Sequence, residues 1–140
     1  MISTRGRYAL RVLIDIAENS NGNYIPLNDI ASRQDISEKY LESILVLLTR
    51  GNLLNGLRGK VGGYKLTKAP EEYTMKSILT ITEGTLAPVA CLKDGAAPCS
   101  KASSCKTLSV WQGLNKAITE YLDSVTLADI IEKPDNYSIE

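Results

Sequence analysis

The chain has 140 residues, of which 44% are hydrophobic, and its 16 lysines and arginines balance 16 aspartates and glutamates. This length allows one domain with an appendage and a core that buries about two thirds of the unfolded surface. No apolar run approaches the roughly 20 residues of a membrane span, and residues 1–5 lack the apolar core of a secretory signal. We therefore expect a cytoplasmic protein without a membrane partner. The chain has no histidine, which excludes chemistry that needs an imidazole from within one chain.

The neutral total hides an uneven distribution of charge. Residues 1–70 hold ten Lys/Arg against six Asp/Glu, a net charge of +4, whereas residues 71–140 hold six against ten, a net charge of −4. A basic half joined to an acidic half is typical of a nucleic-acid-binding part attached to a part with another task.

A first helix is expected to start at Thr4, which can cap it. Its apolar stripe would comprise Tyr8, Ala9, Val12, Leu13, Ile16 and Ala17. Arg5, Arg7 and Arg11 lie near its start, where cations oppose the helix dipole. Either solvent or DNA phosphates could offset this conflict, and Arg5 and Arg7 are therefore candidate DNA contacts.

Residues 27–34 are expected to form a short second helix, separated from a third by a turn at Asp35 and Ile36. Ser37 can cap the third helix, and Gly51 is expected to end it in a left-handed conformation. Apolar residues recur between them at helical spacing, namely at Leu41, Ile44, Leu45 and Leu48. Two helices joined by about three residues have the spacing of a helix-turn-helix.

The opposite face of the third helix is either an ordinary solvated surface or a recognition surface for the major groove. In the second case its N-terminal residues read the base edges. The candidate contacts are then Ser37, Glu38, Lys39, Tyr40, Glu42 and Ser43. Glu42 could accept a hydrogen bond from cytosine N4 and would repel a misplaced phosphate, so it would add selectivity rather than affinity.

Residues 53–67 predict two short strands around a glycine-rich tip that carries Arg58, Gly59 and Lys60. Glycine permits positive φ and a close backbone approach, and an arginine at such a tip suits a narrow minor groove. A plain surface hairpin is the alternative. Together with the helices, the hairpin predicts a mainly α winged helix-turn-helix domain over residues 1–83, closed by a fourth helix.

All three cysteines, Cys91, Cys99 and Cys105, fall in a loop over residues 84–106. Disulfides are disfavoured in the cytosol and would leave one thiol unpaired, whereas clustered thiolates suit an iron–sulfur cluster or zinc. The spacing lacks the CxxC of a zinc ribbon. These residues leave open a cluster site, a thiol redox switch or another role.

Residues 107–123 predict a long helix, followed by a short last helix to residue 131 and a flexible tail over residues 132–140. The long helix has a wide apolar stripe that comprises Leu108, Trp111, Leu114, Ile118, Tyr121 and Leu122. Val125, Leu127, Ile130 and Ile131 would extend this apolar surface into the short last helix. The long helix either packs back on its own domain or pairs with its copy in a two-fold dimer, which we favour. The operator would then be pseudo-palindromic.

Several segments resemble, in order and spacing, the IscR/NsrR/CymR family of bacterial winged-helix transcription regulators: Arg5–Arg11, Asp29–Ala31, Ile36–Glu42 and Arg58–Tyr64. Several of these regulators sense iron–sulfur clusters, nitric oxide or cysteine status. The resemblance implies a homodimer that binds double-stranded DNA. An enzyme, such as a thiol oxidoreductase, is not expected, because the sequence has no CxxC, no histidine and no recognisable acid–base pair. Asp35 departs from it, because the family usually has glycine in this turn, but aspartate tolerates the left-handed region better than most residues.

The resemblance also implies that Cys91, Cys99 and Cys105 match the cluster ligands of the iron–sulfur members, because the clusterless regulators of cysteine metabolism lack this trio. We therefore expect a transcription regulator whose operator binding is modulated by an iron–sulfur cluster, with [2Fe–2S] favoured. The fourth ligand is open, because Leu108 stands where members with a [2Fe–2S] centre have histidine. The alternative is a clusterless regulator of cysteine metabolism, or a thiol redox switch, with the same fold.

Overall fold

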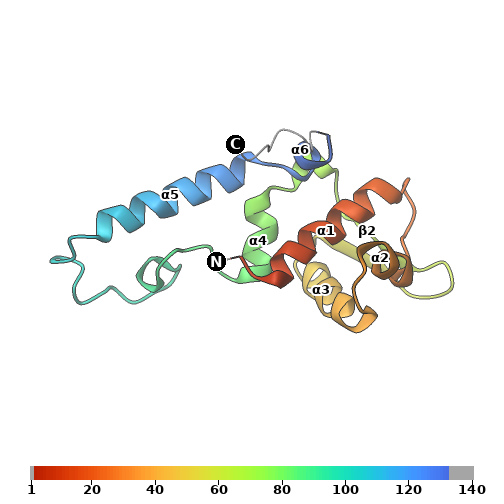
Figure 1. Ribbon diagram of the computed structural model, residues 1–140, viewed down its shortest axis with the longest axis horizontal. Coiled ribbons are helices and arrows are strands. Elements are labelled where there is room, and N and C mark those ends of the chain that lie inside the picture. Colours follow the sequence, from red (N-terminus) through yellow and green to blue (C-terminus); the bar gives the residue numbers. More distant parts are fainter. Residues whose placement is uncertain (1, 133–140) are drawn as a thin grey trace.

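The structure is a computed structural model that describes residues 2–132 (Figure 1). Its elements are α1 (Thr4–Asn19), α2 (Leu27–Gln34), α3 (Glu38–Arg50), β1 (Leu54–Leu57), β2 (Gly63–Leu66), α4 (Met75–Glu83), α5 (Leu108–Ser124) and α6 (Leu127–Glu132), with 3-10 turns at Pro70–Glu72 and Ala90–Leu92. The prediction of a mainly helical fold with a small β-wing and a long C-terminal helix is confirmed. Of the tail predicted over residues 132–140, only Glu132, which ends α6, lies within the described residues.

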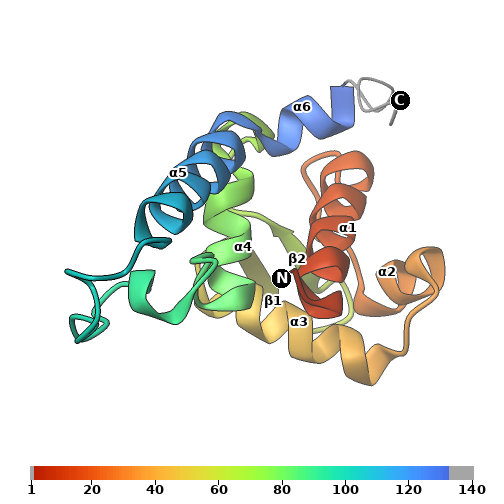
Figure 2. The same ribbon diagram turned by 60° about the vertical axis from the view of Figure 1, so that its left-hand side comes forward.

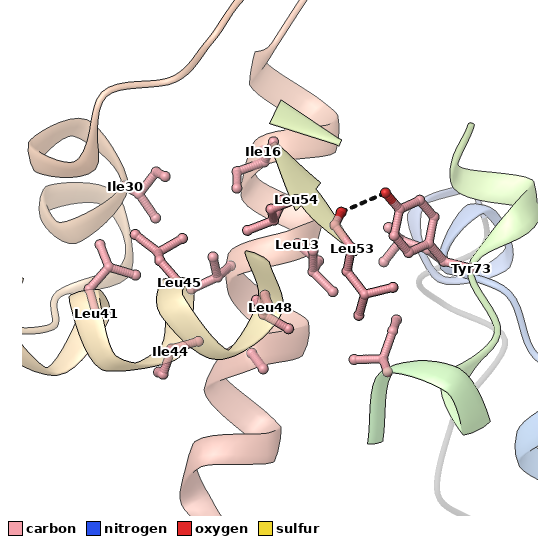
Figure 3. Packing of buried hydrophobic residues seen from close by; sticks show 14 of the residues in the cluster. Leu13, Ile16, Ile30, Leu41, Ile44, Leu45, Leu48, Leu53, Leu54 and Tyr73 are labelled. Carbon is pink, nitrogen blue, oxygen red and sulfur yellow. Dashed lines mark hydrogen bonds between the residues drawn. The ribbon is translucent and has the colours of Figure 1, made fainter. Parts of the chain in front are cut away.

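An apolar core joins α1, α2, α3 and α4 to the wing (Figure 3). The predicted stripe of α3 faces this core, because Leu41, Ile44, Leu45 and Leu48 are all fully buried. Tyr73 is buried with them, and its hydroxyl donates to the Leu53 carbonyl at 2.7 Å. The ring therefore enters the core without an unpaired polar atom. This packing fixes α3 from behind and leaves its opposite face outside the core.

The turn before α3 agrees with the sequence, whereas the cap of α1 does not. Ser37 caps α3, since its Oγ accepts from the Tyr40 amide at 3.1 Å. Asp35 supplies the left-handed residue of the turn, with φ of 52°. The prediction that Thr4 caps α1 was wrong, because the Ser3 hydroxyl accepts from the Gly6 amide at 3.0 Å instead. Ser3 and Thr4 each have a hydroxyl that can cap a helix, and the two choices place the start of α1 one residue apart.

Gly51 ends α3, but the prediction that it is left-handed was wrong. Its φ is −81°, and Asn52, with φ of 60°, takes the left-handed conformation. The glycine serves packing instead, because a Cβ at this position would overlap the Ile81 side chain of α4. The end of α3 and α4 can therefore approach each other closely.

The wing is anchored to the helix-turn-helix by one residue outside the hairpin. β1 and β2 pair antiparallel, with Leu57 opposite Gly63. Ile25, shortly before α2, exchanges two hydrogen bonds of 2.9 Å with Tyr64. Gly63 permits this bridge, because its φ is 145° and a Cβ there would strike the Ile25 carbonyl. The position of the wing is thus tied to that of α2.

α5 extends away from the core, and the segment that carries the cysteines leads out to its far end (Figures 1 and 2). The chain then returns, because the Val125 carbonyl accepts from Met75 and the Leu127 amide donates to Tyr73 at 2.9 and 2.8 Å. The apolar surface that was expected to continue from α5 into the last helix faces the core instead, because Val125 and Leu127 are buried there and Ile130 and Ile131 are partly buried against it. None of the helices in the described range combines the length and apolar character of a membrane span.

Candidate nucleic-acid interface and cysteine segment

The start of α3 presents a polar surface to solvent, opposite the buried stripe. The predicted contacts that are exposed there are Ser37, Glu38, Lys39, Glu42 and Ser43. Within residues 2–132, neither Lys39 nor Glu42 forms an ion pair with another side chain. Both charges are therefore open to an external partner, as a helix that enters a groove requires.

Tyr40 differs from the other candidates on α3, because it is half-buried. Its ring lies edge-on against Tyr8 of α1, with centroids 5.8 Å apart and planes at 89°. The Ser43 hydroxyl donates to the Tyr40 carbonyl at 2.6 Å. Tyr40 therefore lies between α1 and α3, at the edge of the exposed face.

Arg58, Gly59 and Lys60 are exposed at the tip of the wing. The Gly62 amide donates to the Gly59 carbonyl at 3.1 Å and closes the tip. Val61, beside them, has 83% of its surface exposed. Neither cation has a carboxylate partner in the described part of the chain. A protruding loop with two unpaired cations suits the negative potential of a narrow minor groove.

A groove of about 270 Å³ separates α3 from the wing. Its lining comes from both elements and comprises Val46, Thr49, Arg50, Gly56, Leu57, Arg58 and Tyr64. The sequence candidates did not include Arg50, which lines this groove together with Arg58. The spacing of Arg50 from Lys39 and Ser43 puts it on the face opposite the buried stripe, and that spacing could have identified it.

The candidate arginines of α1 are exposed, and each has a partner within the chain. Arg5 Nη2 donates to the Thr82 carbonyl at 2.9 Å, in the last turn of α4, where a cation suits the helix dipole. Arg7 Nη2 donates to Thr4 Oγ1 at 3.1 Å. Arg5 thus joins α1 to α4, whereas Arg7 is bonded only to a hydroxyl of its own helix and can still reach a phosphate.

The structure does not bring the three cysteines together. Cys91, Cys99 and Cys105 are exposed and unbridged, and no group of three or more His, Cys, Asp or Glu within residues 2–132 is arranged to hold a metal ion. Every residue from 93 to 107 is exposed, so no packing prevents this segment from folding around a ligand. Three thiols are the donor set of an iron–sulfur cluster or zinc. The residues therefore fit such a group in their chemistry, provided that the segment folds around it.

Cys105 has a polar neighbour. Its Sγ lies 3.5 Å from Thr107 Oγ1, and hydrogen bonding to Thr107 lowers the pKa of the Cys105 thiol. The thiolate is the form of cysteine that binds metals and acts as a nucleophile. The environment of Cys105 thus favours either role.

α5 exposes apolar side chains that its own protomer does not cover. None of its residues is buried, and Val110, Leu114 and Tyr121 are 58%, 42% and 56% exposed. Their spacing places them on one face of the helix, whereas Trp111 and Leu122 are half-buried. An apolar face of this kind is suited to a partner surface.

Comparison with known proteins gives matches over nearly the whole chain. The family model of Rrf2, described as an iron-dependent transcriptional regulator, matches residues 2–133. The HTH-type transcriptional regulator IscR of Serratia proteamaculans is 31% identical over 134 residues, which cover 96% of this chain and 80% of that protein. The family is one of transcription regulators, so the expectation that the chain is not an enzyme is confirmed.

Solved structures share the fold. CymR, the global cysteine regulator of B. subtilis, has a TM-score of 0.77 and 33% identity, with 96% of this chain and 98% of that chain covered. IscR of T. potens has a TM-score of 0.73 and 31% identity, with coverage of 100% and 92%. The likeness to CymR is as high as that to IscR, so overall similarity does not assign the chain to either branch. The chain belongs to the Rrf2 family of DNA-binding, winged helix-turn-helix transcription regulators.

Proposed function

We propose that this regulator binds DNA as a two-fold dimer, with α3 of each protomer in a major groove and each wing at the adjacent minor groove. The observation that carries the proposal is α3 itself, whose apolar stripe is fully buried while Lys39, Glu42 and Ser43 are exposed. A helix whose apolar face is packed in the core and whose polar face is exposed can enter a groove without unfolding. The protein would act in the cytoplasm, where bacterial DNA lies.

The exposed side chains divide into two roles. Glu38, Glu42 and Ser43 would face base edges, with Glu42 selecting for cytosine. The cations would meet phosphates and the minor groove, and they comprise Arg7, Lys39, Arg50, Arg58 and Lys60. Gly59 would let the wing backbone approach the duplex, and the Ser37 cap would hold the first amides of α3 in place.

The uncovered face of α5 supports the dimer. Val110, Leu114 and Tyr121 would pack against the same residues of a second copy, because a two-fold interface is self-complementary. Two recognition helices related by this axis would read half-sites one helical turn of DNA, or a multiple of it, apart. The operator would therefore be pseudo-palindromic.

We further propose that Cys91, Cys99 and Cys105 hold an iron–sulfur cluster of the [2Fe–2S] type, completed by a ligand outside this trio. Support comes from the donor set, from the exposure of residues 93–107, and from the resemblance to the iron–sulfur members. A bound cluster would supply a redox-sensitive centre. The three cysteines lie in the segment between α4 and α5, so ordering that segment would change the position of α5 relative to the DNA-binding domain. A coupling of about 1–3 kcal/mol would change operator affinity about 5- to 150-fold.

The first experiment tests DNA binding directly. Wild-type protein is used to select duplexes from random DNA, and affinity for the selected site is measured across salt concentrations. We expect a pseudo-palindromic site and a steep fall of affinity with salt, because cations that meet phosphates release counterions. Failure to select any sequence, with weak binding that salt does not change, would contradict the proposed function.

The second experiment tests the cluster. Protein purified without oxygen is assayed for iron, sulfide and visible absorption, and operator affinity is measured before and after oxidation. Cys91→Ala is expected to be colourless and to lose the dependence on oxidation, whereas Ala97→Gly, at an exposed position of the same segment without a side-chain donor, should behave as wild type. A colourless Cys91→Ala variant that still switches as wild type does would refute the mechanism.

A thiol redox switch is the second candidate, and it is favoured by the exposure of all three cysteines and by the lowered pKa of Cys105. Low thiol pKa and access to solvent are the features of oxidation-sensitive cysteines. Metal-free protein that forms a disulfide under mild peroxide, with a matching change in operator affinity, would support this candidate over the cluster. Intact mass and metal content measured on the same sample separate the two.

A further inference from the structure

One face of α1 contacts the start of the recognition helix. Tyr8 packs edge-on against Tyr40 in the first turn of α3, with ring centroids 5.8 Å apart. Arg11, three residues further along α1, places its guanidinium 4.8 Å from the centroid of the Tyr8 ring. Aromatic and cation–π contacts depend on geometry, so these three side chains couple the position of α3 to that of α1.

Arg11 also reaches the end of α2. Its Nη2 donates to the Gln34 carbonyl at 2.9 Å, and its Nε donates to Gln34 Oε1 at 3.1 Å. Gln34 is the last residue of α2, where carbonyls lack partners within the helix and the helix dipole favours a cation. One guanidinium therefore holds the residue immediately before the left-handed turn at Asp35.

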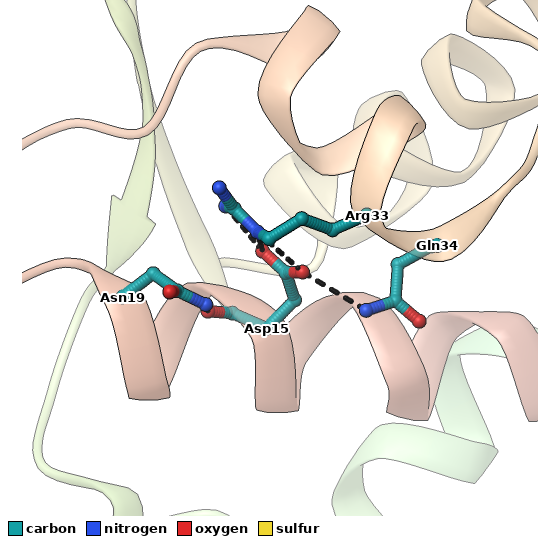
Figure 4. Close-up of polar contacts among 4 residues, drawn as sticks. All are labelled: Asp15, Asn19, Arg33 and Gln34. Carbon is teal, nitrogen blue, oxygen red and sulfur yellow. Dashed lines mark hydrogen bonds and ion pairs between the residues drawn. The ribbon is translucent and has the colours of Figure 1, made fainter.

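Gln34 also contacts Asp15 of α1, a residue that is only 3% exposed (Figure 4). Gln34 Nε2 donates to Asp15 Oδ2 at 2.9 Å, and Arg33 donates to the same carboxylate through Nε at 3.0 Å and Nη2 at 2.7 Å. The hydrogen bonds to Asp15 raise the pKa of the Arg33 guanidinium. A buried carboxylate that loses its partners is destabilising. These hydrogen bonds to Asp15 therefore hold the end of α2 against α1.

These side chains, which we call the turn clamp, are Tyr8, Arg11, Asp15, Arg33, Gln34 and Tyr40. We infer that the turn clamp sets the angle at which α3 enters the groove, and that Arg11 and Tyr40 are positioning residues rather than DNA contacts. The clamp holds both sides of the short connection between α2 and α3, so its geometry passes directly to the recognition helix. The inference rests on the proposed role of α3 in DNA binding.

A direct contact between Arg11 and a phosphate is the competing explanation, because Arg11 is exposed. The two roles have different signatures. A phosphate contact strengthens binding to every sequence and adds to the salt dependence. A positioning residue changes the preference for the operator over other DNA and leaves the salt dependence as it was.

The experiment compares Arg11→Lys with wild type on the selected operator and on a scrambled duplex of the same length, across salt concentrations. Lysine keeps the charge but cannot reproduce the two-point contact with Gln34. We expect operator affinity to fall about tenfold, the scale of a hydrogen bond to a charged group, while affinity for the scrambled duplex and the salt slope stay unchanged. Wild-type affinity on both duplexes, or an equal loss on both, would overturn the inference.

Glu18→Asp is the matched control, because Glu18 is an exposed, charged residue of α1 outside the turn clamp. It should bind both duplexes as wild type does. If it lost operator preference as Arg11→Lys does, the effect would be a general response of α1 and the inference would fail.

A second variant and a second measurement cover the case in which Arg11→Lys does not fold. Tyr8→Leu removes the aromatic contact without changing charge, and it should lose the same operator preference. In either variant, amide hydrogen exchange over residues 36–43 should become faster while exchange in α4 does not change. Wild-type exchange over residues 36–43 in a folded variant would overturn the inference. A wild-type protein that selects no operator would instead refute the proposed function, so the two failures are distinguishable.

Discussion

Residues 2–83 pack into one core together with Val125 and Leu127, whereas residues 84–124 do not complete their own packing. The apolar stripe of α3 is fully buried within the protomer, but no residue of α5 is buried. The cysteine segment before α5 is exposed over residues 93–107. Both helices have apolar residues at helical spacing, so periodicity does not distinguish them. The difference lies in what covers the apolar face.

This contrast separates the part of the chain that one protomer packs by itself from the part for which we propose a partner. The winged helix-turn-helix is held by its own core, by the Ile25 bridge and by the turn clamp. The face of α5 has apolar side chains that suit a second copy of the chain. The three cysteines have thiols that suit a soft-metal ligand. α6 marks the boundary, because Leu127 follows directly after α5 and yet returns to the core.

The largest expected effect is in the core behind α3. Leu45→Ala should lower the free energy of unfolding by about 2–5 kcal/mol, because it leaves a cavity at a fully buried site. Val46→Ala is the neighbouring control at a side chain that is 46% exposed, and it should stay within about 0.5 kcal/mol of wild type. Urea unfolding followed by circular dichroism measures both. Equal losses in the two variants would show that the two faces of α3 are not distinct.

The opposite behaviour is expected on α5. If α5 forms the proposed dimer interface, Leu114→Asp should keep the helix content and the fold of residues 2–83, but raise the dimer dissociation constant about 30-fold or more, the effect of a central interface residue. Sedimentation over a range of protein concentrations measures it. Gln112→Asp, an exposed polar position two residues earlier, should remain dimeric. If Leu114→Asp also remains dimeric, this face of α5 is not the interface.

The sequence predicted most of the fold because helical spacing and capping residues are local signals. α2 and the start of α3 occur where they were expected, and the wing strands and α5 begin or end within a residue or two of prediction. The errors arise where a local signal has two solutions. Ser3 and Thr4 can both cap α1, and the apolar residues that follow α5 could extend its surface or return to the core. Only the packed chain decides between these solutions.

The candidate site was predictable in part for the same reason. The exposed residues of α3 follow from the face opposite its apolar stripe, and those of the wing tip follow from a glycine-rich hairpin. The helical spacing also places Arg50 on that face of α3, but the predicted contacts were restricted to the N-terminal residues of the helix and therefore did not include it. The half-burial of Tyr40 against Tyr8 needed the angle between α1 and α3, which no local pattern contains. Three cysteines in one segment predict soft-metal chemistry, but their spacing along the chain does not determine how they are arranged in space, and the described residues do not form a metal-holding group.

A smaller effect is expected at the wing. Arg58→Ala should weaken operator binding by about 1–3 kcal/mol and reduce the salt slope by about 1, because one cation is lost from the duplex contact. The dimer and the metal content should not change, since Arg58 lies in the wing and not on α5 or in the cysteine segment. Lys116→Ala, which removes an exposed cation from α5, is the control and should leave the slope unchanged. An unchanged affinity for Arg58→Ala would count against the wing as a DNA contact.

The smallest effect is expected in the cysteine segment. The prediction tests whether the contact between Cys105 and Thr107 forms in metal-free protein. Thr107 lowers the pKa of the Cys105 thiol, so Thr107→Val should raise that pKa toward its ordinary value. The thiolate fraction at neutral pH then falls, and alkylation of Cys105 by iodoacetamide in metal-free protein slows, with its pH profile moved to higher pH. Peptide mass spectrometry gives the rate at each cysteine, and Cys99, which has no hydrogen bond to Thr107 in the described structure, is the internal control. An unchanged profile for Cys105 would mean that the contact with Thr107 does not form in the metal-free protein, so that neither Cys105 nor Cys99 has a fixed hydrogen-bond partner there.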